Sequence, residues 1–255
     1  MMKTRELMDV ALKAGEILLR SGAEIYRVED TIRWICSGYN TECESFVLPT
    51  GIFISIKDNT GSEPLTSVKR ISQRTVDLDR IDMVNSFSRQ LHLKLFTYNE
   101  AIDELARIEK RRQYSFFMRL IIACVASFIF TVLFKGSIYE GLASFLIGLI
   151  IFSARELLSK TGLFQFFELL VSGLLAGALA VLSVLLFPEF RLFKIIIGSI
   201  MIFLPGVAIT NSIKDALYGD IVASISRLGE ALFTAAALGA GVGIAVSLGL
   251  SWGLG

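Results

Sequence analysis

Apolar positions in the first part of the chain change their spacing twice. Up to about residue 38 they recur every three or four positions, which is typical of amphipathic helices. Ile52, Ile54 and Ile56 then occupy every second position, the pattern of a half-buried strand. The predicted elements are a helix over 2–20, a second helix ending near Gly38, strands over 42–48, 52–56 and 65–71 with a turn at Asp58–Gly61, and helices starting near Asp77 and Asn99.

After residue 115 the pattern changes to long apolar runs. A helix needs about 20 apolar residues to cross a bilayer. Five runs approach that length, at about 117–134, 138–154, 163–187, 192–213 and 228–252. The fourth contains Pro205 and Gly206, where a missing backbone donor and a missing side chain allow a helix to kink or break. The sequence therefore predicts an α-helical membrane domain of about five spans (116–255) preceded by a small cytosolic α+β domain (1–115).

The distribution of charge agrees with this division. Residues 1–115 carry 17 Lys and Arg and 17 Asp and Glu, whereas residues 116–255 carry only 8 and 7. Neither part has the positive surplus of a nucleic-acid binder. The first 20 residues are charged and lack an apolar core, so no secretory signal is predicted. Basic residues between 107 and 119 favour a cytosolic N-terminus, and five spans then place the C-terminus outside.

The cysteines and the histidine do not indicate a metal site. Cys36, Cys43 and Cys124 lack the CxxC spacing, and His92 is distant from them in sequence. We expect reduced cysteines, no metal and no cofactor. The sequence contains no GxSxG, phosphate-loop or HExxH motif, so an enzyme is not expected. A membrane-tethered hydrolase that uses a serine or threonine near Thr50 is the remaining catalytic alternative.

The segment from Phe203 to Arg227 becomes polar without a long loop. Asn211 and Asp215 are four positions apart and share a helix face, and Gly219 is a natural helix stop. Polar groups at membrane depth are costly, and beside a broken helix they fit a cavity for polar cargo. Two interpretations stay open. The segment is either part of a transport site, or a helix end with a short cytosolic loop in which Asp215 and Arg227 pair.

Glu168 is a second polar feature, about one turn inside the third apolar run. Exposure to lipid costs a carboxylate several kcal/mol or forces its protonation. Glu168 therefore lines a cavity or, if the run is shifted by a turn, lies at the membrane surface. Small residues at three- or four-residue spacing predict close helix packing, within the chain or against a partner: Gly173, Gly177 and Ala180 in the third run, and Ala235, Gly239, Gly243 and Ser247 in the fifth.

The run LPGVAITNSIKDALYGDIVASISRLGEALFTAAALGAGVGI resembles the signature region of the threonine/serine exporter family. Its pattern is Pro-Gly, then Asn211 and Asp215, then Gly219, and then Arg227 before the next span. The segments GAEIYRVED and PTGIFISI in the first part of the chain resemble the cytosolic domain of the family. The resemblance thus covers nearly the whole chain.

Two layouts are implied by the resemblance. Long members are single chains of about ten spans, and short members divide these between two proteins. This chain has the size and order of the larger, five-span subunit of the split two-component type, similar to the succinate exporter pair. The resemblance therefore implies a smaller membrane subunit of the same family as partner, and a homo-oligomer also stays open.

The implied function is export of small polar metabolites across the bacterial inner (plasma) membrane. The cargo is threonine or serine, or a dicarboxylate such as succinate, and transport is coupled to the proton gradient, as in an antiporter. Asp215→Asn is expected to abolish export while the protein level holds. The candidate residues for the cargo or proton site are Asn211, Asp215, Arg227 and Glu168, and those for the helix break are Pro205, Gly206 and Gly219.

A sensory or regulatory protein is the alternative from another class. In that case the cytosolic domain is the active part and the apolar helices only anchor it. Simple anchors need neither the Pro-Gly break nor buried carboxylates, so tolerance of mutation at these positions would favour this alternative.

Overall fold

The structure is a computed structural model that describes residues 2–57, 64–72, 74–111, 114–160, 162 and 164–253. The predicted turn at Asp58–Gly61 lies outside these residues. Contacts divide the chain into two compact units, each with its own helices. The first unit is Met1–Arg112 with Val207–Leu228, and the second is Gln113–Gly206 with Gly229–Gly255.

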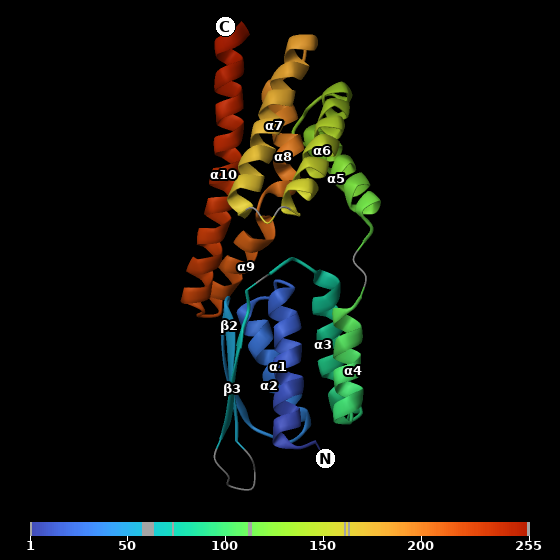
Figure 1. Cartoon of the computed structure of the whole chain (residues 1–255), viewed down its shortest axis with the longest axis vertical. Helices are drawn as coiled ribbons and strands as arrows, with labels where there is room; N and C mark the ends of the chain where they lie inside the picture. The colour runs from blue at the N-terminus through green and yellow to red at the C-terminus, as the bar shows by residue number, and fades with distance from the viewer. Residues whose placement is uncertain are drawn as a thin grey trace. The chain divides into compact units, whose positions relative to one another are not determined.

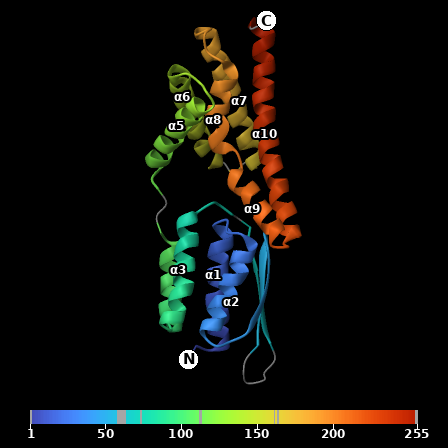
Figure 2. The ribbon, with the colours of Figure 1, turned by 180° about the vertical axis from the view of Figure 1, so that it is seen from behind.

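The N-terminal part of the first unit has three layers (Figures 1 and 2). One layer is an antiparallel sheet in the order β1-β2-β3, the middle layer is α1 and α2, and the third is α3 and α4. The predicted order of helices and strands is confirmed. The bounds are α1 Thr4–Arg20, α2 Ile25–Gly38, β1 Cys43–Leu48, β2 Gly51–Ile56, β3 Leu65–Arg70, α3 Leu78–Leu93 and α4 Tyr98–Glu109.

The middle layer is apolar on both sides, which explains the three-layer arrangement. Ile52, Ile54 and Ile56 point from β2 into the same core as the buried stripes of α1 and α2. The helices of the third layer begin at sequence-encoded caps. Asp77 accepts a hydrogen bond from the Arg80 N–H at the start of α3, as Thr97 does from the Glu100 N–H at the start of α4. Just before α3, the Thr75 and Asp77 N–H groups donate to the Arg20 and Ser21 carbonyls, so this segment is joined to the end of α1, next to the turn at Gly22–Glu24.

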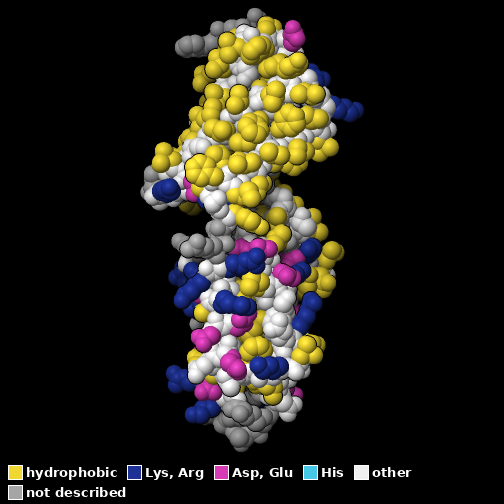
Figure 3. Space-filling view, turned by 90° about the vertical axis from the view of Figure 1, so that its right-hand side faces the viewer, with side chains coloured by type: hydrophobic (Ala, Val, Ile, Leu, Met, Phe, Trp, Pro, Cys, Tyr) yellow, Lys and Arg dark blue, Asp and Glu magenta, His cyan; other side chains and the backbone are white. Residues whose placement is uncertain are grey.

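The second unit is built from apolar helices. Its helices are α5 Phe116–Leu133, α6 Ile138–Ser159, α7 Gln165–Leu186, α8 Leu192–Ile200, the 3-10 turn η1 Met201–Phe203, and most of α10, which runs over Ile221–Gly253. Apolar side chains cover the visible face of this unit, whereas charged side chains are spread over the N-terminal part of the first unit (Figure 3). We call this part, from α1 to α4, the N-terminal domain. In the described part of the chain, α5, α6, α7 and α10 are long and apolar enough to cross a membrane.

A fifth span depends on a broken helix. The pair Leu192–Phe203 and Gly206–Leu217 passes the same test together but is bent by 59°. The second member of the pair is α9, Gly206–Leu217. The break falls at Leu204 and Pro205, where the chain leaves helical geometry. Proline cannot donate the hydrogen bond that a continuous helix would need at this point.

The fourth and fifth predicted runs differ from the structure in their bounds. The run at 192–213 is three helical pieces, which end at Leu217. The run at 228–252 belongs to α10, which already begins at Ile221. Gly219 has a φ of 92°, so the turn between α9 and α10 is completed there, and no proline follows it in the sequence.

Close packing of small residues within the chain is confirmed for α7, whereas packing of the Gly239 and Gly243 face of α10 against a partner stays a prediction. A Cβ at Gly173 would overlap the Leu238 carbonyl, and one at Gly241 would overlap the Leu170 carbonyl. By contrast, a Cβ at Gly239 or Gly243 would meet no described atom within 4 Å. The backbones of α7 and α10 therefore approach at Gly173 and Gly241. Within the chain, α10 turns the face that carries Gly241 toward α7, and not the face that carries Gly239 and Gly243.

Candidate functional site

The short helix α9 and the start of α10 form a hairpin whose polar side chains face inward. Gly219 makes the turn, and Ser212 Oγ donates a hydrogen bond of 2.9 Å to the Ser224 carbonyl across it. Asn211 and Asp215, one helical turn apart on α9, are both buried. Arg227, two turns into α10, is buried as well.

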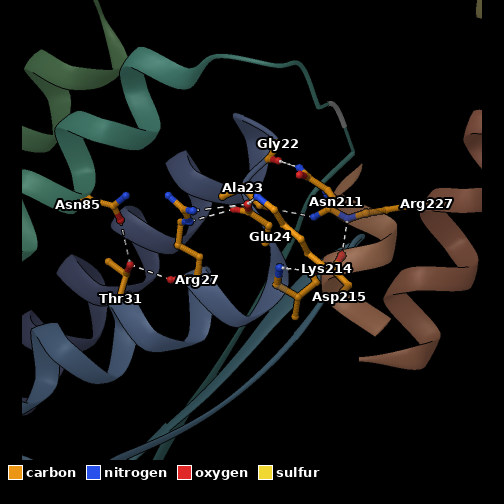
Figure 4. Close-up of polar contacts among 11 residues, drawn as sticks. Gly22, Ala23, Glu24, Arg27, Thr31, Asn85, Asn211, Lys214, Asp215 and Arg227 are labelled. Carbon is orange, nitrogen blue, oxygen red and sulfur yellow. Dashed lines mark hydrogen bonds and ion pairs between the residues drawn. The ribbon is translucent and has the colours of Figure 1, made fainter. Parts of the chain in front are cut away.

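These side chains bind the turn between α1 and α2 (Figure 4). Asn211 Nδ2 donates to the Gly22 carbonyl at 2.9 Å, and Arg227 Nη2 donates to the Ala23 carbonyl at 2.6 Å. Both the hairpin and this turn belong to the first unit. We call the polar clasp the set of hairpin residues Asn211, Lys214, Asp215 and Arg227 together with the turn residues Gly22–Ile25.

Asp215 is the centre of the clasp. Its Oδ1 accepts a hydrogen bond of 3.0 Å from the Ile25 N–H, and its Oδ2 lies 3.0 Å from Arg227 Nε. Ile25 is the first residue of α2, so the carboxylate lies at the positive end of that helix. The predicted pairing of Asp215 and Arg227 across the Gly219 turn is confirmed. Asp215 therefore acts as a helix cap supplied by a distant part of the chain.

Lys214 and Glu24 add an ion pair to the clasp. Lys214 Nζ lies 2.8 Å from Glu24 Oε1, and Arg27 Nε lies 2.9 Å from Glu24 Oε2. Burial alone would raise the pKa of Glu24, but the hydrogen bond from Lys214 and the charge of Arg27 outweigh it and hold that pKa below its ordinary value. Glu24 is therefore ionised at neutral pH. Tyr26 stacks on Tyr218 beside this pair, with ring centroids 3.9 Å apart.

Of the predicted transport residues, the structure brings Asn211, Asp215 and Arg227 together, whereas Glu168 lies in the second unit. The sequence interpretation missed their partners, which are backbone groups of Gly22 and Ala23. No side-chain pattern identifies such partners. Glu24 and Lys214 have opposite charges that allow an ion pair. They are 190 positions apart, so the sequence pattern does not predict their contact.

Glu168 lies in the first turn of α7 and is 8% exposed. Arg155, of opposite charge, lies on α6, the helix that packs against α7. The Arg155 guanidinium lies over the Phe203 ring, 5.3 Å from its centroid. Phe203 is the last residue of η1, directly before the break. A carboxyl group and a guanidinium cation therefore lie on neighbouring helices of the second unit, and the guanidinium lies beside the residue that precedes the break.

Other buried polar groups of the second unit have local partners. Ser127, Thr131, Ser172 and Ser199 each donate to the carbonyl four residues earlier in the same helix. Glu140 is held by Arg191, whose Nη2 is 2.9 Å from its Oε2. These groups stabilise helices and loops. Within the described residues, no group of three His, Cys, Asp or Glu side chains could hold a metal ion.

Four long apolar helices and one broken helix pair place the described chain in the class of multi-pass membrane proteins. The chain belongs to the threonine/serine exporter family, because the family described as "Putative threonine/serine exporter" matches residues 9–249. The predicted resemblance is thereby confirmed.

Two curated relatives carry the same description. The chain is 26% identical over 251 residues to the "Probable threonine/serine exporter" of Mycobacterium tuberculosis, covering 96% of this chain and 46% of the relative. It is 24% identical over 250 residues to the "Threonine/serine exporter" of Corynebacterium glutamicum, covering 95% of this chain and 51% of the relative. The chain thus spans about half the length of the curated relatives it matches. No solved structure shows a significant match.

Proposed function

We propose that this chain is a subunit of a secondary transporter that exports small polar metabolites carrying a carboxylate. The cargo class includes threonine, serine and dicarboxylates such as succinate, and transport is driven by the proton gradient. The N-terminal domain lies in the cytosol, and the apolar helices cross the bacterial inner membrane. The family and the names of both relatives support an exporter.

The observation that carries this proposal is the Arg155 guanidinium beside the broken helix. Broken helices expose backbone groups in a membrane, which is tolerated where they line a cavity. Here the break at Pro205 follows Phe203, and the Arg155 guanidinium lies over the Phe203 ring. The buried Glu168 lies on α7, which packs against the helix of Arg155. Arg155 offers a cation for a cargo carboxylate, and Glu168 offers a group that takes up and releases a proton.

A second membrane subunit completes the proposed transporter. The relatives are about twice as long as this chain, so this chain corresponds to only about half of each. A smaller membrane protein of the same family would supply the corresponding part here. A second copy of this chain is the other candidate for that role.

Efflux of labelled threonine and labelled succinate from loaded cells tests the proposal. One strain expresses this chain alone, and another expresses it with a small membrane protein of the same family. We expect efflux of at least one compound only when both proteins are present. If neither compound leaves in either strain, the exporter assignment fails, and the sensory alternative becomes the one to test.

Substitution of Glu168 tests the site itself. Glu168→Gln removes the proton-binding group but keeps the size of the side chain, so efflux should fall at least about tenfold, as is usual for the loss of a proton-transfer group. Glu189→Gln is the matched control, because Glu189 is exposed in the loop that follows α7. Equal efflux by the two variants, at equal protein levels, would contradict a role for Glu168.

A further inference from the structure

The hairpin of α9 and the start of α10 has two attachments. Its chain continues directly from η1 and into the rest of α10, which belong to the second unit. Its contacts nevertheless group Val207–Leu228 with the N-terminal domain, and Ala223 is part of that domain's core. The hairpin is therefore held by the N-terminal domain through non-covalent contacts, while covalent bonds join it to helices of the other unit.

The contacts that hold the hairpin are mostly polar. Asp215 is fully buried and Arg227 is 5% exposed, and both bind groups of the α1–α2 turn. Removing such charges from water is costly, and the cost is repaid only while every partner is in place. Losing one contact leaves a buried charge unpaired and weakens the rest. The clasp is thus suited to close or to open as a unit, as a switching contact requires.

The same contacts argue against a direct cargo role for these residues. Both oxygens of Asp215 are occupied, one by the Ile25 N–H and the other by Arg227. Asn211 and Arg227 donate to the carbonyls of Gly22 and Ala23. A cargo carboxylate would have to displace the chain's own groups. Side chains that bind their own backbone in this way position one segment on another.

We propose that the polar clasp couples the N-terminal domain to transport, with Asn211, Asp215 and Arg227 as positioning residues. The domain holds the hairpin through the clasp and so acts on the helices that continue from it, η1 before the break and α10 after the turn. Opening of the clasp releases the hairpin and disconnects the domain from transport. This inference rests on the proposed exporter function. It gives Asn211, Asp215 and Arg227 a role in coupling the domain to transport, and not in binding the cargo.

The Glu24–Lys214 pair offers a test that leaves the predicted cargo residues unchanged. Glu24→Lys and Lys214→Glu are made singly and together, so that the double variant restores opposite charges at the 2.8 Å contact. Because Arg27 also pairs with Glu24, all three variants and their parent carry Arg27→Gln. Protein level and thermal midpoint are measured for each variant to detect failure to fold.

Two readouts are taken on the full-length protein. Hydrogen exchange of the backbone amides of residues 22–28 reports whether the clasp is closed, because Asp215 accepts from the Ile25 N–H. Efflux with the partner subunit reports transport. Each single variant should exchange faster and lower the maximal efflux rate at least about fivefold, the lower end of ordinary coupling between sites, without a change in half-saturating cargo concentration. The double variant should restore both.

The outcomes separate coupling from cargo binding. Faster exchange with unchanged efflux overturns the proposal, and so does a double variant that stays as impaired as the single ones. A changed half-saturating cargo concentration with normal hydrogen exchange would place Glu24 and Lys214 in the cargo site, which also overturns the proposal. If the unsubstituted chain exports neither compound, the proposed function fails along with the coupling, while the exchange data still show whether the clasp depends on this pair.

Discussion

Glu24 and Glu29 lie at the start of α2, and their surroundings move their pKa values in opposite directions. The pKa of Glu24 is lowered, because Lys214 and Arg27 outweigh the effect of burial. Burial raises the pKa of Glu29, and the nearby charge of Asp220 raises it further, although the Val47 N–H donates to Glu29 and opposes both. Two carboxylates five positions apart therefore make opposite contributions to stability.

The pH dependence of stability should follow these directions. Ionised Glu24 stabilises the fold above its ordinary pKa of 4.5, and this contribution is lost as pH falls through its lowered value. Glu29 favours the fold when protonated, so its contribution declines as pH rises from 4.5 through its raised value. At neutral pH, Glu24→Gln should cost about 1 kcal/mol, because Lys214 is partly exposed, and Glu29→Gln should increase stability.

Thermal unfolding of the purified protein between pH 4 and pH 8 measures both effects. The two variants are matched, since each replaces a carboxylate with an amide on or beside the same helix. A loss of stability in both at neutral pH would contradict the raised pKa of Glu29. A gain in both would contradict the contribution of the Lys214 ion pair.

Helix packing in the second unit depends on which glycines face a neighbour. Gly241→Ala places a methyl group against the Leu170 carbonyl, so α7 and α10 must move apart. Overpacking of this kind typically costs about 1–3 kcal/mol. Gly239→Ala is the matched control on the same helix, because its methyl group meets no described atom within 4 Å. Thermal midpoints in detergent should fall for Gly241→Ala and hold or rise for Gly239→Ala.

The sequence pattern identifies an element well when its cause is local. The alternation at Ile52–Ile56 and the cap at Asp77 predict a strand and a helix start that are present in the structure. The sequence places the start of α10 too late, because Asp220, Ser224, Ser226 and Arg227 interrupt the apolar run. The helix nevertheless continues through this stretch, where Ala223 joins the core of the N-terminal domain. A contact between distant segments does not produce a periodic pattern of apolar residues in the sequence.

At the scale of the whole molecule, the broken helix decides the side on which the chain ends. With the N-terminus in the cytosol, five spans put the C-terminus outside, and four put it inside. The proposed transporter requires five, with the bent pair counted as one span. A periplasmic reporter enzyme fused after residue 253 should therefore be active, and the same enzyme fused before residue 2 should be inactive. The reverse result at the C-terminus would make the bent pair a re-entrant loop.

The candidate site shows where sequence reasoning reached its limit. The residue types and their spacing singled out Asn211, Asp215 and Arg227, and all three are buried polar residues. Their partners in the Gly22–Ile25 turn are 189 to 204 positions away in the sequence, and they are backbone groups, which every residue carries. The sequence left open whether Glu168 lines a cavity or lies at the membrane surface, and the structure shows it buried. That Arg155 lies on the neighbouring helix follows from helix packing, which local sequence does not predict.

The length of α10 has a mechanical consequence. Its 33 residues form a rod of about 50 Å, whereas the hydrocarbon core is about 30 Å thick. Hiding the whole rod would need a tilt above about 50°, beyond the ordinary range of roughly 0–40°. Within the ordinary tilt range, about 10–20 Å of a helix this long would project beyond the lipid tails, as a lever arm. Pivoting the rod by about 10° sweeps its projecting end through up to roughly 3 Å, comparable to the helix shifts of known conformational switches.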